Sequence, residues 1–503
     1  MKGEFPRNLV DLIEWHADEL ADQPMVLWQD ESITLGQILE SSNRVANALI
    51  SLGVAKGESV SILSPNCPEY YYAWFGALKA GAVFNPVNAL FTAEESAYVI
   101  NHAESRVLMV HPALMPVVEA MRAGIPAIKH VVVMGEGAGP TIAELMREAS
   151  PNAPAVEIAP DDRAAIVYTS GTTGKPKGAV LTHGSYVWDT ASVSEALPMR
   201  PGDRLGLILP LFHVNAQVTS LSQFYAGGCI AMFPRFSPSD FWASVEKYRP
   251  TTFSSVPTML AILLAVPGAE KYDTSSLRYV ICGAAPLSLE LANRFESAFG
   301  LRILEGYGLT EGTCVSSINP FLMPRKIGSI GLPLRGQPMK VVDDNLNDVA
   351  PGEYGEILVK GPNVMSCYFK NPEATAETVV DGWLRTGDAG YVDADGYFFI
   401  VDRIKDMIIR GGENIYPREI EEVLYQNPKI AEAAVVPLPD PFWGEEVKAV
   451  LCLKPGEQAT EEEIVEFCKP RLASYKVPKQ VVFMPEGLPK TATGKIAKKT
   501  LKS

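Results

Sequence analysis

The stretch AAIVYTSGTTGKPKGAV, residues 164–180, runs from an apolar segment through a polar loop into a second apolar segment. Between Thr169 and Ala179 it contains three glycines, four hydroxyl side chains and two lysines. Glycines allow tight backbone turns, and hydroxyls and lysines donate hydrogen bonds to anionic oxygens. We therefore expect a strand that feeds a phosphate-binding loop. A flexible linker is the alternative, and the strand leading directly into the loop argues against it.

The loop is not the P-loop of many nucleotide-binding proteins. In a P-loop, a Ser or Thr that binds magnesium follows the Gly-Lys pair. Here Pro176 follows Gly174 and Lys175, and a proline has no backbone N–H to donate to phosphate. A P-loop kinase is thereby excluded.

Apolar runs of strand length alternate with helical stretches on both sides of this loop. Such alternation predicts an α/β fold with doubly wound sheets. The expected strands fall in residues 59–66, 106–112, 130–136, 164–170, 205–212, 229–234, 251–257, 279–285 and 302–308. A helix is expected over residues 69–81, where Gly81 ends it.

Beyond residue 337 the strands become shorter and turns more frequent, which predicts a small β-rich subdomain over about 337–402. Pro417 then opens a helix that is acidic in its first turns, and further strands and a helix follow. These patterns predict an N-terminal domain of residues 1–402 and a compact α+β C-terminal domain of residues 403–503.

Composition limits the function classes. Hydrophobic residues make up 47% of the 503 residues, and the net charge of −15 argues against a nucleic-acid partner. Seven dispersed cysteines and an N-terminus without an apolar core indicate reduced thiols, no signal peptide and a cytoplasmic protein. The apolar region 70–90 is interrupted by Lys79 and Pro86, so we expect it to be buried rather than to span a membrane. A monomer and a homodimer both remain open.

Several motifs, in a fixed order, resemble those of the adenylate-forming superfamily, which includes acyl- and aryl-CoA synthetases. The motifs are TSGTTGKPKG (169–178), LPLFHV (209–214), GAAP (283–286), EGYGLTE (305–311), TGD (386–388), VDRIKDMIIRGGENIYP (401–417) and PKTATGK (489–495). The resemblance covers essentially the whole chain. It implies that ATP and a carboxylic acid form an acyl-adenylate and pyrophosphate, and that the acyl group then passes to coenzyme A.

The resemblance assigns roles to residues around the phosphates. Glu311 matches the magnesium-binding glutamate, Thr310 an α-phosphate contact, and Lys495 the catalytic lysine at the reacting carboxylate. The loop residues that would contact the β- and γ-phosphates are Thr169, Ser170, Gly171, Thr172, Thr173, Gly174, Lys175 and Lys177. Without the motifs, Lys495 would be interpreted as one of five lysines in a solvated tail. Glu311 would be interpreted as an ordinary surface residue.

Other matches concern adenosine and coenzyme A. Gly283, Ala284 and Ala285 are small enough to approach a purine, and Tyr307, in the motif with Glu305 and Gly306, can stack on its other face. Asp388 and Arg403 match the ribose-binding pair. In the family the C-terminal domain swings about a hinge, here Lys405, and Gly411 and Gly412 would then line the pantetheine tunnel.

The acid would lie near the strand ends that follow the loop. The expected pocket residues are Trp188, His213, Val214, Gln217, Val256, Cys282, Gly306, Gly308 and Thr313. His213 could act as a base, but we favour a neutral gate residue because a carboxylate at pH 7 needs no deprotonation. Members of the superfamily that activate dicarboxylates resemble one another in the sequence E-R-Y-G, which places an arginine at the position of Gly306. Without that arginine a second carboxylate would be buried unpaired, so we favour an apolar monocarboxylate, a fatty or aromatic acid. A dicarboxylate ligase and a ligase that serves a carrier protein are the alternatives.

Overall fold

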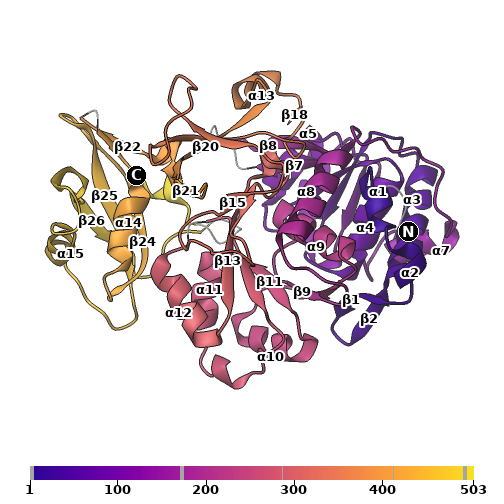
Figure 1. The fold of residues 1–503 in the computed structure, drawn as a ribbon. Helices are drawn as coiled ribbons and strands as arrows, with labels where there is room; N and C mark the ends of the chain where they lie inside the picture. The colour runs from indigo at the N-terminus through magenta and orange to yellow at the C-terminus, as the bar shows by residue number, and fades with distance from the viewer. Residues whose placement is uncertain (1–4, 170–174, 286, 412, 491–495, 503) are drawn as a thin grey trace.

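The computed structural model describes residues 5–169, 175–285, 287–411, 413–490 and 496–502. Its N-terminal part contains two large, mainly parallel sheets covered by helices, and a small antiparallel sheet links them to a C-terminal sheet. In Figure 1, the strands β20 (Trp383–Val392) and β21 (Phe398–Arg403) lie between the two ends of the molecule. The α/β class with a β-rich part and a small α+β C-terminal part is confirmed.

The seven-stranded sheet has the order β18-β8-β7-β4-β3-β5-β6. Its strands are β3 (Ser59–Leu63), β4 (Val83–Val87), β5 (Val107–Val110), β6 (His130–Val133), β7 (Arg163–Thr169), β8 (Lys177–Thr182) and β18 (Cys367–Tyr368). Its helices are α3 (Leu35–Ser51), α4 (Pro68–Lys79), α5 (Ala93–His102), α6 (Met115–Met121) and α7 (Ile142–Glu148). The strands from β3 to β7 are parallel, whereas β8 returns antiparallel to β7 and closes the hairpin that carries the polar loop.

The nine-stranded sheet has the order β15-β14-β13-β12-β11-β9-β10-β1-β2. Its strands are β1 (Pro24–Trp28), β2 (Glu31–Thr34), β9 (Arg204–Leu207), β10 (Cys229–Met232), β11 (Thr252–Ser255), β12 (Tyr279–Cys282), β13 (Arg302–Tyr307), β14 (Ser317–Ile318) and β15 (Leu332–Pro333). Helices in this part of the chain are α1 (Leu9–Ile13), α2 (Ala17–Leu20), α8 (His183–Ala196), α9 (Val214–Tyr225), α10 (Pro238–Tyr248), α11 (Pro257–Leu264) and α12 (Leu289–Phe299). The parallel strands β11, β12 and β13 end side by side.

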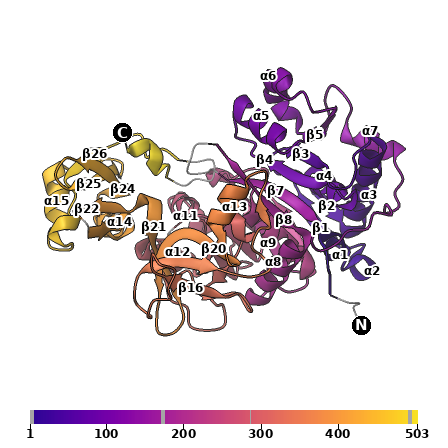
Figure 2. The same cartoon turned by 90° about the horizontal axis from the view of Figure 1, so that it is seen from above.

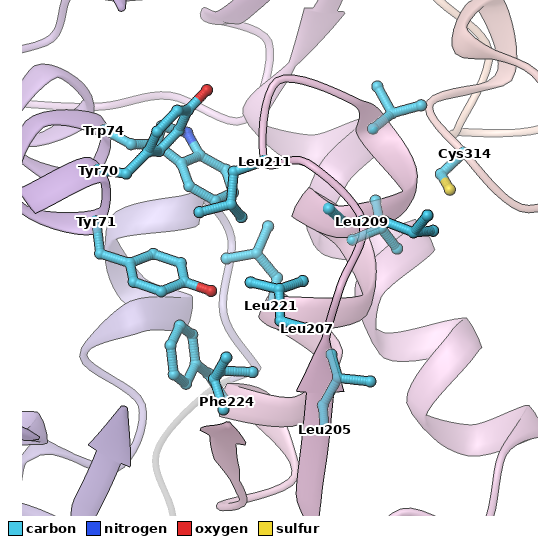
Figure 3. Close-up of a cluster of buried hydrophobic side chains, with 14 of the residues drawn as sticks. Tyr70, Tyr71, Trp74, Leu205, Leu207, Leu209, Leu211, Leu221, Phe224 and Cys314 are labelled. Atoms are coloured by element: carbon cyan, nitrogen blue, oxygen red, sulfur yellow. The ribbon is translucent and has the colours of Figure 1, made fainter. Parts of the chain in front are cut away.

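One hydrophobic core joins these two sheets, and most of residues 70–84 belong to it, whereas Leu90 at the end of the apolar region 70–90 is 67% exposed. Tyr71 and Trp74 of α4 are buried, and the Tyr71 ring lies 5.3 Å from the Phe224 ring of α9. Figure 3 shows these side chains among the leucines of β9 and α9. The tyrosine hydroxyl reaches Ser220 Oγ at 3.0 Å, which satisfies a polar group inside the core. Among the described residues, no helix combines the length and apolarity that a membrane span requires.

The small antiparallel sheet lies where the shorter strands were predicted. It consists of β16 (Met339–Val342), β17 (Gly355–Val359), β19 (Val379–Val380), β20 and β21, with α13 (Pro372–Thr378) beside it. The C-terminal sheet has its own buried core. Its elements are β22 (Ile408–Arg410), β23 (Glu413–Ile415), β24 (Ile430–Asp440), β25 (Gly444–Leu453) and β26 (Gln480–Phe483), with α14 (Pro417–Tyr425) and α15 (Glu461–Cys468). Figure 2 shows this sheet at the opposite end of the molecule from α5 and α6. The predicted domain boundary at residues 402 and 403 falls at the end of β21 and stays a prediction.

Candidate active site

The polar loop is held at both ends by the β7–β8 hairpin. Thr169 pairs with Lys177 in its register, and residues 170–174 of the loop, which include the predicted Ser170, Gly171, Thr172, Thr173 and Gly174, lie outside the described residues. At the end of the loop that leads into β8, the Tyr98 hydroxyl of α5 donates to the Pro176 carbonyl oxygen at 3.2 Å. The two loop lysines each lie over an aromatic ring. Lys175 Nζ is 5.6 Å from the Tyr98 centroid, and Lys177 Nζ is 5.1 Å from the Tyr368 centroid.

Glu311 is brought to the same place from a distant part of the sequence. It lies in the short 3₁₀ turn Thr310–Gly312 that follows β13. Its Oε1 atom accepts hydrogen bonds from Thr169 Oγ1 at 3.3 Å and from the Tyr368 hydroxyl at 2.7 Å. Both bonds end on the same oxygen, so neither uses the lone pairs of Oε2. A carboxylate held in this way beside loop lysines fits the oxygen donor that Mg²⁺ prefers, with nucleotide oxygens and water completing the shell.

Asp388 is the centre of a second polar cluster. It is buried in β20, where it pairs in register with Arg403 at the end of β21. Arg403 Nε lies 2.6 Å from Asp388 Oδ1, and the Tyr307 hydroxyl donates to Asp388 Oδ2 at 2.6 Å. Burial, followed by the neighbouring Asp388 carboxylate, raises the pKa of Tyr307 well above its usual value, so its hydroxyl stays a donor. The predicted ribose pair and the predicted adenine-stacking ring are thus in direct contact.

The predicted purine slot lies at the ends of β12 and β13. A Cβ atom on Gly283 would come within 2.8 Å of the Gly306 carbonyl oxygen, so only a glycine permits this approach of the two strands. Ala284 follows with φ of 66°, a left-handed conformation that costs an alanine about 1–2 kcal/mol. Backbone strain of this kind gathers at binding sites. Ala284 is exposed and Ala285 half-buried, as surfaces open to a ligand must be.

Glu305, predicted from the same motif as Tyr307, is almost fully buried below this slot. Burial raises the pKa of its carboxyl to about 7, although Arg418 of α14 and the backbone amides of Leu287 and Gly328 act in the opposite direction.

The structure brings most of the predicted acyl-pocket segments to one edge. Val256, Cys282 and Gly306 follow or end neighbouring strands, because Ser255 pairs with Cys282 and Cys282 with Glu305. His213 and Val214 open α9, and Trp188 packs on the main core from α8. Open α/β sheets bind their ligands at the carboxyl ends of the strands, where Val256, Cys282 and Gly306 lie.

Two predicted pocket residues have their polar groups bound within the protein. Gln217 is fully buried, accepts from the Tyr186 hydroxyl at 2.6 Å and donates to the Leu211 carbonyl oxygen at 2.9 Å. Thr313 is equally buried and donates to the Asn363 carbonyl oxygen at 2.6 Å. Their roles as pocket walls stay predictions.

The hinge segment and the C-terminal motifs are only partly described. Lys405 lies exposed in the 3₁₀ turn Ile404–Asp406, directly after Arg403 and β21. Gly411 has φ of 59°, and a Cβ atom there would lie 2.7 Å from the Trp443 ring, so the position requires glycine. Gly412 and Lys495 lie outside the described residues.

Sequence reasoning missed several residues that the fold adds to the site. Tyr98 and Tyr368 contact the loop lysines, and Ser254 Oγ donates to Asn215 Oδ1 at 2.8 Å beside the strand ends. Tyr98 lies in a helix and Tyr368 in a two-residue strand, each far in sequence from the loop. No local pattern marks them, because only the assembled sheet brings them to the hairpin.

Comparison with known proteins agrees with this site. The model of the AMP-binding enzyme family matches residues 13–369, and that of the AMP-binding enzyme C-terminal domain matches residues 419–495. These matches cover more than half of the chain. The chain therefore belongs to the family of AMP-binding enzymes.

Individual relatives are similar over nearly their whole length. A feruloyl-CoA synthase from Amycolatopsis sp is 38% identical over 473 residues, which cover 93% of this chain and 93% of that protein. A long-chain-fatty-acid–CoA ligase from Mycobacterium tuberculosis is 38% identical over 477 residues, 94% of this chain and 93% of that protein. The crystal structure of the anthranilate CoA ligase AuaEII in complex with anthranoyl-AMP superposes with a TM-score of 0.93 at 32% identity, over 98% of this chain and 96% of that one.

Proposed function

We propose that this AMP-binding enzyme is an ATP-dependent acyl-CoA ligase that forms AMP and acts on an apolar monocarboxylate. It is an acid–thiol ligase: the carboxylate and ATP give an acyl-adenylate and pyrophosphate, and the thiol of coenzyme A then displaces AMP. The observation that carries the proposal is that Thr169, Glu311 and Lys177 come together at the β7–β8 hairpin, called the phosphate-loop hairpin below. The relatives that couple acids to coenzyme A support the acceptor.

The first half-reaction sets one anion against another. A carboxylate oxygen attacks the α-phosphorus, the bond to the bridging oxygen breaks, and pyrophosphate leaves with the electron pair. Stabilising this transition state requires positive charge and alignment more than proton transfer. Lys175 and Lys177 lie at the loop and would stabilise the departing pyrophosphate. Glu311 would hold Mg²⁺, which supplies positive charge beside the phosphate oxygens. Thr310 and Lys495 are assigned to the α-phosphate and the carboxylate.

Adenosine would lie on the surface made by Gly283, Ala284 and Ala285. The ribose hydroxyls would meet Asp388, whose carboxylate is already oriented by Arg403 and Tyr307. An arginine placed in this way holds the carboxylate in one orientation, so the ligand does not have to order it.

The second half-reaction needs a different set of groups around the same acyl carbon. The thiol sulfur attacks the carbonyl carbon, and AMP leaves with the oxygen that the carboxylate supplied. Rotation about Lys405 would withdraw the segment with Lys495 and bring in the loop of Gly411 and Gly412. Glycines in that loop allow its backbone to approach the pantetheine arm closely.

Gly306 favours an acid with an apolar tail. It has no side chain at the position where E-R-Y-G, the sequence typical of the dicarboxylate enzymes, has its arginine. The second carboxylate of a dicarboxylate substrate would therefore lack that partner. Two of the relatives, a feruloyl-CoA synthase and a long-chain-fatty-acid–CoA ligase, are named for acids of this kind.

A panel of fatty, aromatic and dicarboxylic acids tests the proposal directly. Each acid is incubated with ATP, Mg²⁺ and either coenzyme A or a phosphopantetheinyl carrier protein, and nucleotide products are separated. We expect AMP, pyrophosphate and an acyl-CoA with apolar monocarboxylates. ADP as the main product would refute the ligase class. Acyl transfer to the carrier alone would refute coenzyme A as the acceptor.

A further inference from the structure

Tyr368 occupies a rigid position beside the phosphate-loop hairpin. It lies in β18, which pairs antiparallel with β8 so that Tyr368 faces Ala179 in the register. Its backbone N–H donates to Thr375 Oγ1 at 2.9 Å, and the next N–H, that of Phe369, donates to the Gly178 carbonyl oxygen at 2.7 Å. The side chain is only 7% exposed. Tyr368 is therefore fixed from both its strand and the helix that follows.

The hydroxyl of this tyrosine is directed at the carboxylate of Glu311. Its 2.7 Å bond to Oε1 is shorter than the 3.3 Å bond from Thr169 to the same oxygen. The bond from the tyrosine is the shorter of the two, so the tyrosine provides the main restraint on the carboxylate.

The ring of the same residue carries one of the loop cations. Lys177 Nζ lies 5.1 Å from the Tyr368 centroid, within the range of a cation–π contact. One buried side chain thus touches both an anion assigned to the metal and a cation assigned to the phosphates. The two contacts use different parts of the residue, the hydroxyl and the ring face, and substitutions can separate them.

We propose that Tyr368 is a positioning residue for the metal-binding end of the site. By engaging Oε1 it turns Oε2 of Glu311 toward the nucleotide, and its ring places Lys177 beside the same phosphates. This role rests on the proposed function of Glu311 as the magnesium ligand. Residues that orient a metal-binding carboxylate typically change metal affinity by about 10- to 100-fold when they are removed.

The test measures how strongly magnesium and nucleotide support each other's binding. The non-reactive analogue α,β-methylene-ATP is titrated into the whole protein by calorimetry, once with Mg²⁺ and once with EDTA, and the ratio of the two dissociation constants is the coupling. In Tyr368→Phe we expect the coupling to fall roughly 10-fold. Affinity in EDTA should change by less than about twofold, because the ring below Lys177 remains. In Tyr368→Leu affinity in EDTA should also fall.

Two further variants separate this proposal from the role of Glu311. Glu311→Gln should reduce the coupling more than Tyr368→Phe does, and adding Tyr368→Phe to it should leave the remaining coupling unchanged, because the tyrosine acts through that carboxylate. The matched control is Tyr248→Phe, which loses a hydroxyl bond of 2.9 Å to the Gln29 carbonyl oxygen in the α10 region and should keep the wild-type coupling.

The outcomes are distinct. Normal coupling in Tyr368→Phe together with reduced coupling in Glu311→Gln would overturn the proposal and leave Glu311 as the metal ligand. An additive loss in the double variant would also overturn it, since the tyrosine would then act by another route. Unchanged coupling in Glu311→Gln would refute the metal assignment itself, and the role of Tyr368 with it.

Discussion

At the scale of single residues, the proposed choice of an apolar acid rests on Gly306. A Cβ atom at this position would lie 3.5 Å from the Ile318 side chain and from the Ser317 carbonyl oxygen, which is ordinary van der Waals contact. The backbone therefore accepts a larger residue here. The fold does not require a glycine at this position. The glycine can therefore be explained by the proposed substrate.

The first prediction concerns this choice. Monocarboxylates with apolar tails should exceed malonate by at least about a hundredfold in kcat/KM, because a second buried carboxylate without a partner costs several kcal/mol. Gly306→Arg should narrow that gap, mainly by blocking the apolar acids. Competition assays with both acid classes measure the ratio. A wild-type preference for malonate would show that the pocket has been misinterpreted.

Glu305 gives a prediction about pH. Burial raises its pKa from 4.5 to about 7. Between these two pH values the Glu305 carboxyl is protonated in the folded protein and ionised in the unfolded chain. The stabilisation from this proton is complete below pH 4.5 and is lost as the pH rises through 7. Arg418 and Glu422 of α14 face the same carboxyl and act in opposite directions.

Comparison of the wild type with Glu305→Gln isolates this effect. The free energy of unfolding of the wild type, relative to the variant, should fall by up to about 3 kcal/mol between pH 4.5 and 8, at about 1.4 kcal/mol per pKa unit. Urea unfolding at several pH values measures it. A difference that is constant with pH would mean that Glu305 has an ordinary pKa in the folded protein.

At the scale of elements, the segment between β13 and β14 doubles back on itself. A Cβ atom on Gly308 would lie 1.5 Å from the Cys314 carbonyl oxygen, so the two passes of the chain touch at this glycine. The doubled segment carries Thr310 and Glu311 on its turn. Close packing of backbone on backbone thus fixes the turn that presents the proposed metal ligand.

Gly308→Ala should therefore be much more damaging than Gly306→Ala. The backbone cannot move away cheaply, and we expect a loss of about 3 kcal/mol or more, compared with less than about 1 kcal/mol at Gly306. Chemical denaturation of the two variants makes the comparison. Similar stabilities would contradict the tight passage at Gly308.

Elements themselves were predicted well where the pattern was local. The strands 229–234 and 279–285 were expected around β10 and β12, but the expected strand 205–212 is confined to Arg204–Leu207 because Pro210 cannot continue the ladder. Likewise α15 ends at Cys468, two residues before Pro470, because the residue before a proline is disfavoured in a helix. Glu311, Asp388 and Arg403 were found through motifs. Tyr98 and Tyr368 were not, because their contacts depend on the pairing of β8 with β18 and on the packing of α5.

At the scale of the whole molecule, α14 of the C-terminal part contacts β21 through Arg418. The Arg418 backbone N–H donates to Asp402 Oδ2 at 2.9 Å, and its guanidinium donates to the Ile400 carbonyl oxygen at 2.5 Å. Polar contacts of this kind would suit the proposed rotation between the two half-reactions. Lys405, the proposed hinge, lies between Asp402 and Arg418 in the chain.

A proline at the hinge should separate the two half-reactions. Lys405→Pro fixes φ near −65°, so adenylate formation should remain within a few-fold of the wild type while thioester formation is abolished. Pyrophosphate exchange measures the first step and acyl-CoA production the overall reaction. Equal losses in both assays would place the hinge at another residue. Lys405→Ala, which loses the same side chain but leaves φ free, is the matched control and should keep both half-reactions.

The central claim is that the carboxylate itself attacks the α-phosphorus of ATP. It is tested by supplying the preferred acid with both carboxylate oxygens labelled as ¹⁸O, together with ATP, Mg²⁺ and coenzyme A, and recording ³¹P spectra of the products. An acyl-adenylate leaves one labelled oxygen on its phosphorus when the thiol displaces AMP. We therefore predict one ¹⁸O atom in each AMP formed and none in pyrophosphate. Unlabelled AMP, or ADP with the label in inorganic phosphate, would contradict the account.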